Sequence, residues 1–239
     1  MSMARDSLAV LLSMGLGWAS LAADAPDAEV NPATGEIESV DTELNGVDFD
    51  LRHTVDPGQG APGETVLLTI SPDNDLRPRM TITPGGQAWV VWWRDASTNA
   101  VLCRKRAGNG SWQPERTVSL PAQNSHHPEI AFHGTHPWIA YEFDGSGGTG
   151  IAAVGIDDTP DPFGRTTLAV SQFAGDPDVR IHAESGHLWI TWIQDGSFVG
   201  WSELDPGSQT WLPAGLESYV TDGSVAGARS RIRTQVLTP

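Results

Sequence analysis

Residues 77–97 read RPRMTITPGGQAWVVWWRDAS, and this stretch decides the fold because the chain contains two further versions of it. Residues 127–146 read HPEIAFHGTHPWIAYEFDGS, and residues 176–197 read DPDVRIHAESGHLWITWIQDGS. Each stretch has proline at its second position, then two aromatic residues three positions apart, then an Asp-x-Ser sequence. Such self-similarity is the signature of a repeat architecture. The repeats span about residues 76–124, 125–174 and 175–222.

The segments within a repeat have strand character. In the first repeat, short runs rich in β-forming residues are separated by Gly, Pro and Asp turns, at 80–82, 88–93, 100–104 and 116–120. The second run is apolar on both faces, because Trp89 and Val91 alternate with Val90 and Trp92. Such a strand must be covered on both sides. We therefore predict an all-β fold, a β-propeller-like array of four-stranded antiparallel blades.

The number of blades is less clear from the sequence than their architecture. Residues 65–70 resemble the outermost strand of a blade that precedes the first repeat, and residues 47–55 alternate like a strand. Residues 225–237 fit either a strand or a short C-terminal helix, and the spacing slightly favours the helix. We expect three clear blades and a partial fourth. They form either a small closed ring or an open arc that pairs with a second copy.

The chain begins with the pattern of an export signal. Arg5 precedes an apolar run from residue 8 to residue 18, and small residues follow it. This run is too short to span a bilayer stably. We predict a signal peptide at residues 1–23, with an uncleaved anchor as the alternative. The mature protein is then periplasmic or secreted and has no membrane contact after cleavage.

The charge is strongly negative and unevenly distributed. The 239 residues include 14 basic and 30 acidic residues, giving a formal net charge of -16, which argues against a nucleic-acid partner. Residues 24–46 are acidic and poor in aromatic residues, so we expect a disordered arm before a propeller-like domain at 47–239. The lone Cys103 excludes an intramolecular disulfide and a multi-cysteine metal cluster.

Three features together resemble the blades of bacterial sialidase-like propellers, the superfamily that includes the Asp-box repeat proteins. They are the proline before an apolar strand, the Trp-(Val/Ile)-x-(Trp/Tyr) strand, and the Trp-x-Pro sequences at Trp112 and Trp211. Residues 205–211 are similar to an Asp-box with one extra residue, and residues 108–112 are a more distant relative. The resemblance covers about residues 64–220 and implies a propeller fold.

The catalytic set of the sialidases is not matched. The family uses three arginines, a tyrosine nucleophile assisted by glutamate, and an aspartate acid/base. Tyr141 and Tyr219 are the only tyrosines, and Tyr141 occupies a repeat position filled elsewhere by Trp92 and Trp192, which indicates packing. The Arg-Ile-Pro motif of the family is missing. We therefore predict no catalytic residues and lean against an enzyme; if the chain has an activity, it is that of a glycoside hydrolase.

The antiparallel order of strands predicts where a ligand would bind. The connection into the innermost strand and the turn after the second strand lie at the same end of every blade. The charged residue after each proline should lie near the central axis, at Arg79, Glu129 and Asp178. The residues that we expect at this loop face are Arg77, Arg79, Asp95, His126, His127, Glu129, Asp144, Asp176, Asp178 and Asp195.

Each of these residues also has a purely structural interpretation. The Asp-x-Ser sequences suit tight turns, because their side chains accept backbone N–H groups. The charged residues Arg79, Glu129 and Asp178 could form a structural ion-pair cluster instead of a binding site. His126 and His127 could bind a divalent metal with Asp144, but adjacent side chains in a strand point to opposite sides. We therefore expect no metal site and no cofactor.

The leading hypothesis is an exported, non-catalytic module. It binds a glycan or an extracytoplasmic protein through the loop face. The first alternative is a small sialidase-like glycoside hydrolase. The second is a structural module that pairs its open edges and forms a homodimer that completes the propeller. We also expect Trp89, Trp138 and Trp189 to occupy one equivalent buried position.

Overall fold

The structure, a computed structural model, describes residues 26–58, 63–159, 161–181, 186–196 and 198–218. For residues 176 and 178–181 it describes the backbone alone. The predicted signal peptide and the predicted terminal helix lie outside these residues. Within them, no helix is long and apolar enough to cross a membrane.

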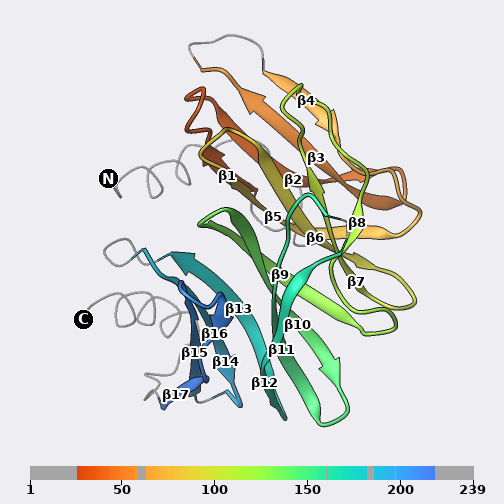
Figure 1. Cartoon of the computed structure of the whole chain (residues 1–239). Helices are drawn as coiled ribbons and strands as arrows, with labels where there is room; N and C mark the ends of the chain where they lie inside the picture. Colours follow the sequence, from red (N-terminus) through yellow and green to blue (C-terminus); the bar gives the residue numbers. More distant parts are fainter. Residues whose placement is uncertain (1–25, 59–62, 160, 182–185, 197, 219–239) are drawn as a thin grey trace.

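The described chain forms four antiparallel sheets, as an all-β propeller-like array requires (Figure 1). The first consists of β1 (Asp27–Val30), β2 (Ile37–Asn45), β3 (Asp48–Asp56) and β4 (Glu64–Leu67). The second consists of β5 (Asn74–Ile82), β6 (Ala88–Asp95), β7 (Ala100–Lys105) and β8 (Arg116–Thr117). The third consists of β9 (Ser125–His133), β10 (His136–Gly145), β11 (Gly148–Gly155) and β12 (Phe163–Ser171). The fourth consists of β13 (Ala174–Ile181), β14 (Leu188–Gln194), β15 (Phe198–Asp205), β16 (Thr210–Trp211) and β17 (Gly215–Ser218).

The sheets stack through three apolar clusters. One joins the first and second sheets through residues such as Val40, Leu51 and Trp92. Another joins the second and third sheets, and the last joins the third and fourth. Among the described residues, none of these clusters joins the fourth sheet back to the first. The sheets thus follow one another along an open arc (Figure 1).

The aromatic pair of each repeat explains the stacking. The first tryptophan packs toward the following sheet: Trp89 lies in the cluster with the third sheet, and Trp138 in the cluster with the fourth. The second aromatic packs toward the preceding sheet, as Trp92 does. In the fourth sheet Trp189 is only partly buried, because no described sheet follows it. The expected burial is therefore correct for Trp89 and Trp138, which are 3% and 0% exposed, and wrong for Trp189.

The acidic arm is ordered where it is described. The expectation of disorder is wrong for residues 26–46, because β1 and the whole of β2 lie there. Acidic side chains of β1 have partners in the next sheet: Asp27 accepts the N–H of Met80 at 2.8 Å, and Glu29 accepts the N–H of Ile82 at 2.9 Å. These carboxylates accept backbone N–H groups along the outward edge of β5, the innermost strand of its sheet. The acidic side chains of β1 therefore stabilise the packing of the first sheet on the second.

The first sheet also completes the blade that the sequence predicted only in part. Strand β4 is its outermost strand, as the resemblance of residues 65–70 to later outer strands indicated.

The lone thiol, Cys103, lies fully buried between the second and third sheets, and burial raises its pKa to about 12. It is therefore a packing residue and not a reactive thiol.

Candidate functional site

The candidate site begins at a break in the innermost strands. The pairing of β5 with β6 shifts register between Leu76 and Arg79, and the pairing of β9 with β10 shifts at the equivalent place. Each shift surrounds the proline of the repeat, which has no N–H to donate to the ladder. The residue before this proline has a positive φ in both blades, 51° at Arg77 and 50° at His127. A non-glycine residue in this region is unusual and often marks a functional site.

The positive φ of His127 changes the direction of its side chain. In a regular strand His126 and His127 would point to opposite faces. Here their rings lie 4.7 Å apart, centroid to centroid, at an interplanar angle of 75°. The argument from strand alternation that separated the two histidines is therefore wrong, because a bulge interrupts the alternation at this point.

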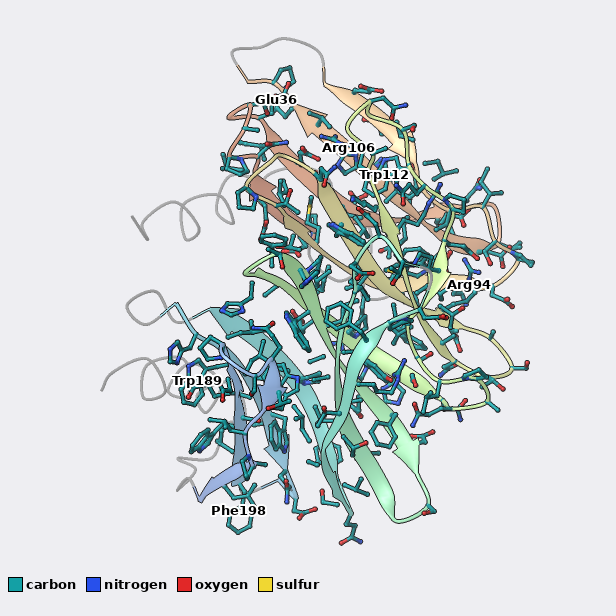
Figure 2. All side chains as sticks on the ribbon, in the orientation of Figure 1. Glu36, Arg94, Arg106, Trp112, Trp189 and Phe198 are labelled. Carbon is teal, nitrogen blue, oxygen red and sulfur yellow. The ribbon has the colours of Figure 1, made fainter. Side chains whose placement is uncertain are left out.

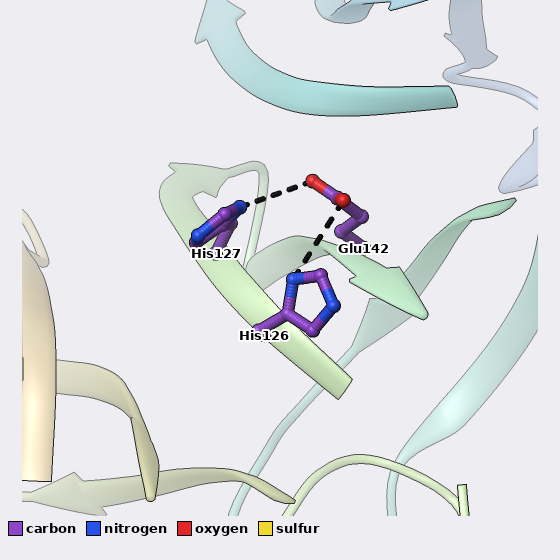
Figure 3. A group of neighbouring side chains, drawn as sticks. All are labelled: His126, His127 and Glu142. Carbon is purple, nitrogen blue, oxygen red and sulfur yellow. Dashed lines mark hydrogen bonds and ion pairs between the residues drawn. The ribbon is translucent and has the colours of Figure 1, made fainter. Parts of the chain in front are cut away.

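Both histidines face the carboxylate of Glu142 on the neighbouring strand β10 (Figure 3). His127 Nδ1 lies 3.1 Å from Oε2, within hydrogen-bond distance, and His126 Nδ1 lies 3.7 Å from Oε1. Glu142 is 6% exposed, and the side chains of the histidines are 18% and 33% exposed. The cluster thus has a buried carboxylate behind two imidazoles that reach the surface.

Two further side chains border this cluster. Asp144 Oδ1 lies 3.7 Å from His126 Nε2. The indole of Trp93, on β6 of the preceding sheet, meets both imidazoles edge-on, with centroids at 6.1 and 6.2 Å. Burial is the main cause that lowers the pKa of His126, and the nearby charge of His127 adds to it, against the opposing effect of Glu142 and Asp144.

A comparison between the blades indicates that the fold does not require polar residues here. His126 pairs across the strands with Glu142. At the equivalent place the second blade pairs Leu76 with Trp93, and the fourth pairs Gly175 with Ile193. Since the other blades use apolar residues or glycine, the third blade departs from its own repeat. Residues that depart from the structural pattern are candidates for function.

The fourth sheet leaves room for the carboxylate. A Cβ atom on Gly175 would lie 2.8 Å from Oε2 of Glu142 and 3.1 Å from its Cδ. Any larger residue at this position would displace the glutamate side chain. The position of Glu142 is therefore fixed by the third and fourth sheets together.

The charged residues after the prolines were expected to converge, and for two of them the structure gives the geometry. Arg79 Nε donates to Glu129 Oε1 at 2.9 Å, which joins the inner strands of the second and third blades. Their side chains are 24% and 20% exposed. The side chain of Asp178 lies outside the described atoms. The observed pair fits the structural ion-pair interpretation as well as a binding role.

Two of the aspartates that were predicted at the loop face make contacts in turns. Asp195 accepts the N–H of Phe173 at 3.0 Å, and Asp144 accepts from the side chain of Asn124 at 3.2 Å. Each contact ties the turn after a second strand to the entry of the same blade. Asp95 is exposed, and Arg77 is half-buried at the bulge. Of Asp176 the structure describes only the backbone, on β13.

The sequence analysis missed Glu142 and Trp93 as members of this site. The available signal was the alignment of the repeats, which places Glu142 at the position of Trp93 and Ile193. A charged residue at an aromatic or aliphatic position of a repeat is a departure that the sequence alone displays.

The expectation for Tyr141 is consistent with its environment. Tyr141 is fully buried in the cluster between the second and third sheets, and its hydroxyl accepts from Arg165. Burial raises its pKa, against the opposing effect of Arg165. A nucleophile needs the opposite environment, so Tyr141 is a packing residue.

Solved structures of similar fold include a sialidase and a family-43 glycoside hydrolase. The chain is similar to the Trypanosoma rangeli sialidase in complex with 2,3-difluorosialic acid, with a TM-score of 0.56 and 14% identity over 80% of this chain and 37% of that one. The complex of the same sialidase with the inhibitor DANA gives a TM-score of 0.52 and 13% identity over 78% of this chain and 37% of that one. A thermostable family-43 glycoside hydrolase gives a TM-score of 0.50 and 11% identity over 87% of this chain and 75% of that one.

The sequence matches no protein-family model and no curated protein. The chain spans little more than a third of the length of the sialidase. At these identities the likeness concerns the fold alone, and it agrees with the four antiparallel sheets, three of four strands and one of five, that follow one another along the chain. The chain has a sialidase-like β-propeller architecture.

Proposed function

We propose that this protein is an exported, non-catalytic propeller module that binds a neutral glycan at the corner formed by Trp93, His126, His127 and Glu142. The observation that carries the proposal is the cross-strand pair of His126 with Glu142. It replaces the apolar residues that the neighbouring blades use at the same place. The second and fourth blades form without polar residues at this place, so the pair in the third blade is better explained by ligand binding than by the fold.

The residues of the corner suit the chemistry of a sugar. A sugar has apolar C–H faces that pack on aromatic rings, and hydroxyl groups that donate strongly to carboxylates. Trp93 and the two imidazoles supply rings, and Glu142 and Asp144 supply acceptors. The Nε1 atom of Trp93 is buried and has no hydrogen-bond partner, so a donor is also present at the corner. The nearby Arg79 already has Glu129 as a counterion, which favours a neutral ligand over an anionic one.

A binding role fits these residues better than catalysis. Most glycoside hydrolases use two carboxyl groups on opposite sides of the scissile bond. At this corner, Glu142 is buried behind two histidines, and Asp144 is held in a turn by Asn124. Export follows from the predicted signal peptide at residues 1–23, as does a periplasmic or secreted location.

The test is a glycan array followed by calorimetry with the best ligand. We expect Glu142→Gln to weaken binding at least about 10-fold, because an acceptor with full charge is replaced by a neutral one of the same shape. The matched control is Glu203→Gln, which alters a glutamate that contacts His187 in the fourth sheet. Equal affinities of the two variants would contradict the proposed site. Hydrolysis of fluorogenic glycosides by the wild type would favour the enzyme alternative.

A second candidate function is self-association, because the two ends of the arc differ in character. The outer face of the first sheet is polar: Arg52 makes two hydrogen bonds to Asp41, at 3.1 and 2.8 Å. The outer face of the fourth sheet has Trp189 and Trp201, whose ring centroids lie 5.2 Å apart. Trp189 alternates with Leu188 and Ile190, which face the third sheet, and so lies on the other side (Figure 2).

An aromatic pair on an outer sheet face is typical of an interaction surface. A second copy of the chain that packs the same face of its own fourth sheet against this one would cover it. Sedimentation equilibrium tests this candidate: we expect a dimer for the wild type and a shift toward monomer for Trp189→Ser. Arg52→Ser, on the polar end, is the matched control. A monomer at all concentrations would exclude self-association.

A further inference from the structure

We infer that His126, His127 and Glu142 form a binding site for a divalent transition-metal ion of the Zn²⁺ class. The three residues offer two imidazole nitrogens and one carboxylate oxygen that all lie within 4.8 Å of one another. This donor set, with nitrogen and oxygen ligands, is one that Zn²⁺ and its neighbours in the first transition series prefer. Figure 3 shows the two rings and the carboxylate facing one another.

The distances fit an ion at the centre of the group. Zinc–nitrogen and zinc–oxygen bonds of about 2.1 Å at tetrahedral angles separate neighbouring ligand atoms by about 3.4 Å. The measured separations are 3.1 Å from His127 Nδ1 to Glu142 Oε2 and 3.7 Å from His126 Nδ1 to Glu142 Oε1. These two separations lie within a few tenths of an ångström of that spacing, and all the ligand atoms lie within 4.8 Å of one another.

The hydrogen bonding of His126 is incomplete without a ligand. Its Nδ1 atom is buried and makes no hydrogen bond. A buried ring nitrogen without a partner is unfavourable, and an ion that accepts its lone pair would satisfy it. Its other nitrogen, Nε2, faces Asp144 Oδ1 at 3.7 Å. A carboxylate behind a ligating imidazole orients the ring and raises its basicity, which is the usual second contact of a metal-bound histidine.

The site is anchored more firmly than an incidental histidine–glutamate contact. Gly175 of the next sheet has no side chain that could displace the carboxylate, and the bulge at His127 places the second ring beside the first. Three protein ligands leave a fourth position open on the exposed side of the imidazoles, where water or another oxygen ligand can bind. His187 and Glu203, by contrast, supply a single histidine.

The test uses the full chain without a polyhistidine tag, freed of metal by a chelator, and Zn²⁺ alone as the probe. Calorimetry should show one high-affinity ion per chain. His126→Ala and His127→Gly should each weaken it by more than about 100-fold, since losing a ligand costs more than losing an outer contact. Glycine is chosen at position 127 because it accepts the positive φ. Asp144→Asn should weaken binding about 10-fold.

The matched control is His187→Ala, which removes another histidine beside a glutamate and should leave the affinity unchanged. A Co²⁺ spectrum with strong visible bands would independently report tetrahedral coordination, and it should disappear in His126→Ala. The melting temperature of each metal-free variant shows whether it is folded. The inference is overturned if the wild type binds no Zn²⁺, or if His126→Ala and His187→Ala bind it equally. The inference is tested separately from glycan binding, because the assay contains Zn²⁺ and no glycan.

Discussion

Two buried glutamates in this molecule contact histidine, and their surroundings differ. Glu38, on β2, is fully buried and accepts from Asn31 at 2.6 Å, from Arg106 at 2.7 Å and from His53 at 2.9 Å. His53 is itself buried and meets Trp112 edge-on at 5.0 Å. Arg106, which is labelled in Figure 2, directly follows β7 of the second sheet and donates to Glu38 across the two sheets. This network is closed and joins two blades.

The cluster around Glu142 is open. Its histidines reach the surface, and one buried nitrogen of His126 has no hydrogen bond. The comparison teaches that a buried glutamate beside histidine is not in itself a functional site. The closed network supports the fold, because every contact is internal. The open cluster has binding capacity left for a ligand.

The largest effect that we expect comes from breaking the closed network. Glu38→Ala leaves Arg106 and His53 without the carboxylate that compensates their burial, and removal of one partner from a buried ion pair costs about 3–5 kcal/mol. Urea unfolding of the variant and the wild type measures this loss. A change below about 1 kcal/mol would show that the network does not support the fold.

The second prediction concerns pH. Burial alone would raise the pKa of Glu38, but hydrogen bonds from His53 and Asn31, together with the charge of Arg106, hold this pKa below its usual value. The resulting stability is present above the pKa of an unfolded glutamate, about 4.3, and is lost as the pH falls through the lower pKa of the folded state. The difference in unfolding free energy between the wild type and Glu38→Gln should therefore shrink on acidification from pH 7 to pH 3. A difference that stays constant would contradict the lowered pKa.

Much of the fold follows from the sequence, and the exception is the first sheet. The repeated prolines and tryptophans predict the later blades, because Trp89, Trp92 and Trp138 each cover a neighbouring sheet. The first sheet lacks this pattern, and its acids suggested disorder. Asp27 and Glu29 instead accept backbone N–H groups of β5, and Glu38 lies in the closed network. Composition cannot distinguish solvated acids from acids that the next blade binds.

The site was predictable in its location but not in its geometry. The order of strands placed His126 and His127 at the loop face, and the repeat placed proline after His127. The positive φ that turns His127 toward its neighbour arises from the register shift at this proline, which no local propensity reveals. Glu142 was missed for another reason. Its departure from the repeat becomes visible only when residues 136–145 are aligned, residue by residue, with the second strands of the other repeats.

A third prediction tests the open cluster for stability. Glu142→Gln should change the unfolding free energy by no more than about 1 kcal/mol, because its histidine partners are partly exposed and can bind water instead. The same variant should lose most of its affinity for Zn²⁺. Melting curves in the presence of a chelator, beside Glu38→Gln, make the comparison direct. If Glu142→Gln lowered the unfolding free energy as much as Glu38→Gln does, Glu142 would have a structural role like that of the closed network.

The smallest effect is expected at a third histidine–glutamate contact, which serves as the reference for both. His187, directly before β14, contacts Glu203 of the neighbouring strand β15, and the two side chains are 37% and 16% exposed. Because water competes for the exposed part of the imidazole, a partly exposed pair of this kind should contribute less than about 1 kcal/mol. His187→Ala should shift the melting temperature by no more than about 4 °C for a domain of this size. A larger shift would mean that even exposed histidine–glutamate contacts support this fold. The small effect expected at Glu142 would then need an explanation other than exposure of its partners.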